Sequence, residues 1–239
     1  MKGEKRFHGP LSTEYRLYKR ARPQWDELER QIGAAIARQR PMKAAGPLVV
    51  VELGCGTGFT TAAILAARPD VSLSTVDNEG QMVAQARRNL RSWIRAGTVK
   101  VTQADALSHL VRRRTGSVDA VASMFTLHNF ERRYRGRVLR HIYRVLKPGG
   151  VFVNADKYAK GTRDQAKVLR EQLIRYFDVL VPIGRHDLFN EVVAHYMSDE
   201  GEAHVMKEAD AVRAMRRLGF RSIRRPFHRG MDAVYLAHK

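Results

Sequence analysis

Residues 48–61 read LVVVELGCGTGFTT, an apolar run that meets one acid, Glu52, and then has glycine at every second position. The apolar run predicts a buried strand of a parallel sheet over residues 48–53. Gly54, Gly56 and Gly58 allow the backbone to leave this strand sharply and to approach a ligand where a Cβ atom would clash. A helix that begins after the glycines directs its N-terminus at the same place. The stretch therefore predicts a ligand site at the end of a strand.

The glycine pattern differs from two well-known phosphate-binding motifs. The dinucleotide fingerprint GxGxxG requires glycine at position 59, where Phe59 stands, and the Gly-Lys-Ser/Thr ending of a P-loop is absent. Glu52 also repels phosphate and attracts a ligand that carries positive charge. The pattern thus favours a ligand other than a pyrophosphate.

The rest of the chain alternates strand and helix patterns, which predicts a doubly wound, mostly parallel α/β sheet. Further strands are expected at residues 71–77, 99–105, 118–125 and 151–156, with two more at the C-terminal end. Helices are expected at residues 78–94 and 131–146, the second one stopped by Pro148 with Gly149 and Gly150.

Two helical segments fall outside this alternation. The first is residues 1–45, where Ser12 is the expected cap of a helical region at 12–40, and the second is an insertion at residues 161–206. In an open α/β sheet, extra helices can cover the crevice at the carboxyl ends of the strands. We therefore interpret both segments as a lid on one domain that spans residues 1–239.

Acids at the ends of the next two predicted strands indicate the type of ligand. Asp77 can accept hydrogen bonds from both hydroxyls of a ribose. Asp105 can accept from an exocyclic amine such as that of adenine, and Ala106 leaves room for the ring. A nucleoside without phosphate, with a positively charged end near Glu52, describes S-adenosylmethionine.

The stretches VELGCGTG, VDNEGQM, QADA, VDAVASMFTLHNF and LKPGG resemble the successive motifs of class I S-adenosylmethionine-dependent methyltransferases. The resemblance implies a Rossmann-like, seven-stranded sheet with an antiparallel last strand, and S-adenosylhomocysteine as a product. It also implies cofactor contacts from Glu52, Gly54, Cys55, Gly56, Gly58, Asp77, Asn78, Met82, Asp105, Ala106, Ser123 and Met124. LGCGTG and NADKY are similar, in addition, to methyltransferase-like proteins associated with 5-oxyacetyl uridine modification of tRNA.

Residues near the acceptor are harder to assign, because in-line methyl transfer from a sulfonium depends mainly on alignment of the two reactants. His128 is the first candidate for a general base, with local packing as the ordinary alternative. Asp156 and Tyr158 leave the fifth strand at the same edge and are further catalytic candidates. His195 could reach the site from the lid, although we expect at least one of His195 and Tyr196 at the surface.

Cys55 is the only cysteine, which excludes a cysteine-based zinc site and an internal disulfide. We interpret Cys55 as a small residue in a tight turn rather than a nucleophile, and we predict no metal site.

The chain is strongly basic, with 43 Lys and Arg against 24 Asp and Glu and a net charge of +19. Such a charge attracts nucleic acid or acidic small molecules, although basic residues recur along most of the sequence. We expect methyl transfer to a small polar or acidic metabolite. The alternatives are methylation of RNA or tRNA, and a protein that keeps the cofactor pocket, has lost methyl transfer and binds nucleic acid with its basic surface. No segment has the length of a membrane span or the pattern of a signal peptide, so we expect a cytoplasmic protein. The oligomeric state is left open.

Overall fold

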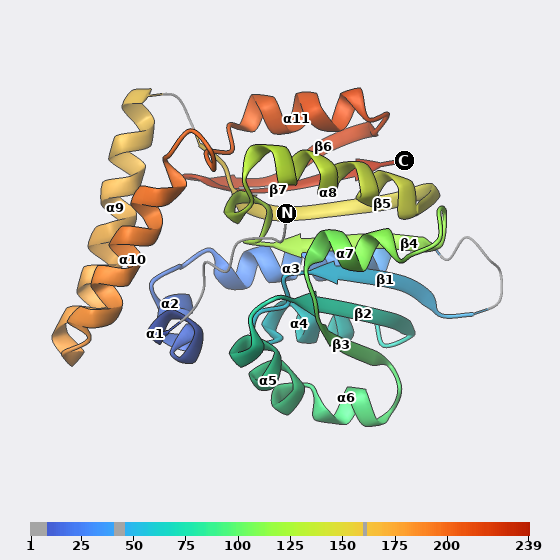
Figure 1. The fold of residues 1–239 in the computed structure, drawn as a ribbon, viewed down its shortest axis with the longest axis horizontal. Coiled ribbons are helices and arrows are strands. Elements are labelled where there is room, and N and C mark those ends of the chain that lie inside the picture. Colours follow the sequence, from blue (N-terminus) through green and yellow to red (C-terminus); the bar gives the residue numbers. More distant parts are fainter. Residues whose placement is uncertain (1–8, 41–45, 160–161) are drawn as a thin grey trace.

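The computed structural model describes residues 9–40, 46–159 and 162–239. Their strands form one seven-stranded sheet in the order β3-β2-β1-β4-β5-β7-β6 (Figure 1). The strands are β1 Leu48–Leu53, β2 Val71–Asp77, β3 Val99–Gln103, β4 Val118–Met124, β5 Leu146–Lys157, β6 Arg221–Arg229 and β7 Asp232–His238. The first five pair in parallel, whereas β7 runs antiparallel to β5. The predicted doubly wound sheet with its antiparallel last strand is confirmed.

Helices cover both faces of the sheet. One core includes side chains of α3 Trp25–Arg38, α4 Phe59–Ala67 and α5 Gly80–Asn89. The other includes side chains of α7 Ala106–Val111, α8 Arg132–Val145 and α11 Glu208–Arg217. Val50 and Val51, neighbours in β1, belong to different cores because successive side chains of a strand point to opposite faces. The central strands are therefore apolar on both sides, as their sequences predict.

Several predicted element ends are shifted. The helix expected at 78–94 is two helices, α5 and α6 Arg91–Arg95, which meet at the fully buried Leu90. Helix α8 ends at Val145, and β5 already includes Leu146, which is buried and pairs with Val118. Pro148 therefore lies inside the strand and does not stop the helix.

The predicted helix cap at Ser12 is wrong. Helix α1 Pro10–Thr13 begins after Gly9, and the Ser12 hydroxyl lies inside this helix, where it donates a hydrogen bond of 2.8 Å to the Gly9 carbonyl. Pro10 accounts for the earlier start, because proline suits the first position of a helix.

The extra helices gather at one end of the sheet. Figure 1 shows α9 Thr162–Leu180 and α10 His186–Asp199 standing across the end toward which β4 points, next to α1 and α2 Tyr15–Arg20. The Gln172 side chain of α9 donates a 2.9 Å hydrogen bond to the Ala21 carbonyl, which ties α9 to the N-terminal segment. The lid role of these helices stays a prediction, and residues 1–8, 41–45 and 160–161 of the two predicted lid segments lie outside the described residues. Among the described helices, none has the length and apolar character that crossing a membrane requires.

The β1–α4 loop takes its shape from glycines with positive φ. Gly54 has φ of 73°, and a Cβ atom there would lie 2.0 Å from the Thr126 hydroxyl oxygen. Gly58 has φ of 91°, and its Cβ would lie 3.0 Å from a methyl carbon of Leu90. The first glycine therefore lets the loop approach the β4 end, and the third lets it approach α5.

Gly54→Ala is expected to lower the free energy of unfolding by about 2–4 kcal/mol, because it combines left-handed strain with a steric clash. Gly97→Ala is the matched control, since Gly97 has φ of 74° but no atom within 4 Å of the added Cβ. The control should cost about 1–2 kcal/mol. Chemical denaturation of both variants measures the difference, and equal losses would contradict the proposed clash with Thr126.

Candidate active site

A pocket lies at the carboxyl ends of the first four strands. Eight of the predicted cofactor residues line it: Gly54, Gly56, Asp77, Asn78, Met82, Asp105, Ala106 and Met124. The other lining residues are Tyr15, Val76, Glu79, Ala104, Phe125, Thr126, Asn129 and Phe130. The predicted residues Glu52, Cys55, Gly58 and Ser123 are not part of this lining.

Asp77 connects the pocket wall to the glycine loop. One carboxylate oxygen accepts a 2.9 Å hydrogen bond from the Gly56 N–H, and the other accepts a 3.0 Å bond from the Glu79 N–H. Burial raises the pKa of Asp77, and these backbone donors oppose that shift. The side chain thus holds two turns of the wall while it borders the pocket.

Asp105 follows β3 rather than ending it, and caps α7. One carboxylate oxygen accepts a 2.9 Å hydrogen bond from the Ser108 N–H, and the other accepts from the Tyr134 hydroxyl. Both oxygens already have protein donors, so a ligand amine would have to share one of them.

Glu52 lies beneath the glycine loop. It is fully buried, and one carboxylate oxygen accepts from the hydroxyls of Thr61 at 2.6 Å and Thr75 at 2.8 Å. The other oxygen has no hydrogen-bond partner among the described residues. Burial, the largest cause, raises the pKa of Glu52 to about 7. The predicted direct contact between Glu52 and the cofactor therefore has no support in the pocket lining.

Cys55, Gly58 and Ser123 also lie behind the wall. Cys55 and Ser123 are buried, while Gly58 packs against Leu90. Burial raises the pKa of the Cys55 thiol, which keeps it protonated and agrees with its interpretation as a turn residue.

The charge of the pocket is one-sided. Asp77, Glu79 and Asp105 line it, and no Lys or Arg is among its described lining residues. Such a site favours a ligand with ammonium or sulfonium groups and disfavours phosphate. The sequence analysis expected a positively charged ligand because of Glu52. In the structure this expectation rests on Asp77, Glu79 and Asp105 instead.

His128 forms a buried pair with Asp156. Its Nδ1 lies 2.5 Å from one Asp156 oxygen, and the other oxygen accepts a 3.0 Å hydrogen bond from the Leu127 N–H. If Nδ1 carries the proton that Asp156 accepts, the neutral ring leaves Nε2 free to accept another proton. Both side chains are nearly inaccessible, with 4% and 0% of their surface exposed.

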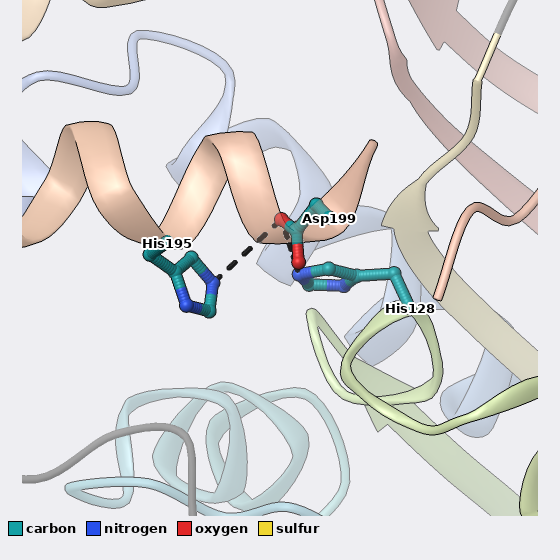
Figure 2. Close-up of side chains that lie close together, drawn as sticks. All are labelled: His128, His195 and Asp199. Atoms are coloured by element: carbon teal, nitrogen blue, oxygen red, sulfur yellow. Dashed lines mark ion pairs between the residues drawn. The ribbon is translucent and has the colours of Figure 1, made fainter. Parts of the chain in front are cut away.

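Helix α10 closes over this pair. Figure 2 shows His128 and His195 on two sides of the Asp199 carboxylate, one oxygen of which lies 3.8 Å from the His128 Nε2 and 3.7 Å from the His195 Nε2. The Lys157 ammonium contacts the same oxygen at 2.7 Å. The structure therefore brings His128, Asp156 and His195 together, as predicted, and adds Lys157 and Asp199.

Two expectations about neighbouring residues need correction. Tyr158 packs in the core that contains α8 and α11, where its hydroxyl accepts a 2.7 Å hydrogen bond from Asn154, so it does not join His128. The expected surface position for His195 or Tyr196 is wrong, because both are buried. The Tyr196 hydroxyl accepts a 3.1 Å hydrogen bond from Arg22, which explains its inward position.

His128, His195 and Asp199 could each offer one atom to a metal ion, since these atoms lie within 4.8 Å of one another. The Lys157 ammonium, however, already occupies the shared Asp199 oxygen. A dication beside this buried ammonium would be repelled by several kcal/mol, on the order of 8 kcal/mol at 4 Å for an effective dielectric constant of 20. The geometry favours an ion pair here, and the absence of a metal site stays a prediction.

The segment after β4 contributes more to the site than the sequence indicated. Phe125, Thr126, Asn129 and Phe130 line the pocket, and Phe125 has φ of 46°, an unusual value for a residue with a side chain. The only sequence signal was the stretch FTLHNF itself, which had identified His128.

Arg135, in the first turn of α8, is buried. Its guanidinium donates to the carbonyls of Leu127 at 2.8 Å and Phe130 at 2.7 Å, and burial lowers its pKa to about 10. This arginine therefore fixes the segment that carries His128.

Known proteins share both the domain and the fold. Residues 50–150 match the family model described as a methyltransferase domain. The carboxy-S-adenosyl-L-methionine synthase of Campylobacter curvus is 27% identical over 152 residues, which cover 64% of this chain and 61% of that enzyme. This chain thus spans less than two thirds of that relative.

Two solved structures are similar in fold. An O-methyltransferase family protein from Burkholderia thailandensis matches with a TM-score of 0.65 at 16% identity, covering 97% of this chain and 60% of that chain. A Haemonchus contortus N-methyltransferase, solved with phosphomonomethylethanolamine and S-adenosylhomocysteine, matches with a TM-score of 0.59 at 15% identity, covering 91% and 58%. The family match supports the predicted methyltransferase domain over residues 50–150, and the two solved structures share the predicted fold.

The raised pKa of Glu52 predicts a pH-dependent loss of stability. Because its folded pKa of about 7 exceeds the ordinary value of 4.5, its contribution is fully present below pH 4.5 and is lost as pH rises through 7. Glu52→Gln should remove this dependence. Relative to wild type, the variant should therefore gain about 3 kcal/mol in unfolding free energy between pH 4.5 and pH 8. Urea denaturation at several pH values checks this, and parallel curves for the two proteins would contradict it.

Proposed function

We propose that this chain, whose residues 50–150 match a methyltransferase domain, transfers a methyl group from S-adenosylmethionine to a small polar or acidic metabolite. The observation that supports this most is the position of the segment 125–130. Its residues line the acid-walled pocket and also carry His128, whose Nδ1 lies 2.5 Å from Asp156. A cofactor pocket and a buried acid-base pair thus share one short segment.

Different residues of the pocket contact different parts of the cofactor. Asp77 is positioned to accept hydrogen bonds from the ribose hydroxyls, and Asp105 with Ala106 borders the space for adenine. Met82, buried in the pocket wall, packs against the base. Gly54 and Gly56 let the backbone approach the amino-acid end, whose positive charge the acidic wall stabilises.

His128 removes the proton from the acceptor. Its Nε2 takes the proton of a hydroxyl as the methyl group moves, and the Asp156 carboxylate stabilises the imidazolium that forms. Asp199 now lies 3.8 Å from this Nε2, so the acceptor can reach His128 only when α10 moves aside. This requirement supports the lid role of α9 and α10, which would then close over the reactants and exclude water.

Because a relative is named carboxy-S-adenosyl-L-methionine synthase, a carboxylated form of the cofactor is a second candidate for the group donor. A carboxylate on the methyl group needs a cationic partner, and the described lining residues of this pocket include no Lys or Arg. Unmodified S-adenosylmethionine is therefore the donor that the lining supports.

RNA methylation is the second candidate, supported by the net charge of +19. Nucleic-acid binding without catalysis is the third. Because any basic protein binds RNA at low salt, only submicromolar affinity for tRNA near physiological salt would favour these two over a metabolite acceptor.

Asp77→Ala should weaken S-adenosylhomocysteine binding by about 1–3 kcal/mol, because it removes both the ribose acceptor and the bonds that hold Gly56 and Glu79. Asp77→Asn keeps one acceptor and should lose less. Calorimetric titration measures both, with NAD as the control ligand. Unchanged affinity in Asp77→Ala would place the cofactor elsewhere.

His128→Asn should lower the rate of methyl transfer about 100-fold or more while S-adenosylhomocysteine affinity stays near that of wild type, because only the proton acceptor is lost. The assay is transfer of a labelled methyl group to a panel of hydroxylated metabolites and to bulk tRNA. Labelling of tRNA alone would contradict the metabolite proposal, and an active His128→Asn enzyme would exclude His128 as the base.

A further inference from the structure

Exposed apolar side chains gather on the helices α9 and α10. In the described part of the chain, five large apolar side chains are between 47% and 53% exposed. Four of them lie on α9, on α10 or on the short helix η2 Val181–Ile183 that joins the two: Ile174, Phe177, Ile183 and Met197. A single exposed apolar side chain needs no explanation, whereas a cluster of them marks an interaction surface.

Helix α9 has an inward and an outward side. The inward side carries three buried residues spaced four apart, Gln172, Tyr176 and Leu180. Three exposed residues have the same spacing, Arg170, Ile174 and Asp178. Because a step of two residues turns a helix by about 200°, these two rows lie on opposite sides of α9. The second row therefore faces outward, on helices that Figure 1 shows at the outer edge of the molecule.

An apolar groove of about 360 Å³ lies on this outward side. Apart from Arg170, its described lining is apolar: Ala166, Leu169, Leu173, Ile174 and Phe177 of α9, and Phe189 of α10. The rings of Phe177 and Phe189 meet edge to face, with their centroids 5.7 Å apart. A groove of this kind suits the apolar side of another helix.

The charge of α9 and α10 differs from that of the whole chain. Residues 162–199 contain five Lys and Arg and six Asp and Glu, a net charge of −1, whereas the whole chain carries +19. Two copies of a strongly basic protein repel each other where their basic surfaces approach. This repulsion is weak at α9 and α10, so a second copy can approach there.

The outward row of α9 is complementary to itself. Arg170 lies four residues before Ile174 and Asp178 four residues after it, about 6 Å along the helix axis in either direction. Both charged side chains are exposed, and neither forms an ion pair with a described residue. If two α9 helices pack antiparallel about a two-fold axis at Ile174, each Arg170 faces Asp178 of the other copy.

We propose that this chain forms a two-fold symmetric homodimer in which the outward sides of two α9 helices pack antiparallel. Ile174 and Phe177 of each copy contact the apolar groove of the other. The Arg170–Asp178 pairs select the antiparallel direction, because a parallel arrangement would place like charges opposite each other. This interface does not depend on the proposed methyl transfer.

Sedimentation velocity of the full chain, from about 1 to 100 µM, measures its assembly. Wild type should be a dimer in the upper part of this range. Ile174→Glu should weaken dimerisation about tenfold or more, because it places two acids at the two-fold axis. Val111→Glu is the matched control, since Val111 is 52% exposed, as against 47% for Ile174, but lies at the end of α7. This control should dimerise like wild type.

A charge exchange tests the orientation. Arg170→Glu and Asp178→Arg should each weaken dimerisation about tenfold or more, because each places like charges opposite each other at both ends of the interface. The double variant restores opposite charges and should dimerise within about threefold of wild type. Since the two positions are about 12 Å apart on one helix, contact within one copy does not account for such a rescue.

Circular dichroism like that of wild type would show that each variant is folded. A wild type that stays monomeric at about 100 µM would overturn the proposal, as would a double variant that dimerises no better than the single ones. If monomeric wild type instead sediments with phosphatidylcholine vesicles and Ile174→Glu does not, the surface binds lipid rather than a second copy.

Discussion

The hydrogen bonds from the Gly56 and Glu79 N–H groups to Asp77 hold together two walls of the acid-lined pocket. They join the turn after β1 to the turn after β2. The distance between the ends of these two strands at the pocket is therefore fixed. A carboxylate is well suited to this task, because it accepts from two backbone donors at once and still borders the pocket. Position 54 serves the same end, since the absence of a side chain there lets Thr126 bring the β4 end close to the loop.

The sequence predicted the parts of the structure that local patterns control. Strand β1 follows directly from its apolar run, and the glycines and Asp77 mark the pocket because parallel strands end at a common edge. Asp199 could not be predicted in the same way. Its partner Lys157 lies 42 residues earlier, and nothing in the local pattern of α10 distinguishes this acid from an exposed one. The burial of Arg135 could not be predicted either, because its acceptors are backbone carbonyls that only the folded loop 127–130 presents.

Two buried ion pairs lie beside the extra helices. Lys157 pairs with Asp199, and Arg22 pairs with Asp232, with every one of these side chains nearly inaccessible. Such pairs add little net stability relative to apolar side chains, but separation of one pair leaves a charge without compensation. Helix α10 therefore has few acceptable positions against the sheet, and movement of Asp199 requires either water or another anion at Lys157.

The Arg22–Asp232 pair joins residues 210 positions apart in the chain. During synthesis, Arg22 therefore leaves the ribosome 210 residues before its counter-ion. Until then a side chain destined for the interior carries an unmatched charge, so the segment between α2 and α3 cannot dock stably on the sheet. The crevice at the strand ends thus stays open on the nascent polypeptide and is completed only when β7 is added beside β5.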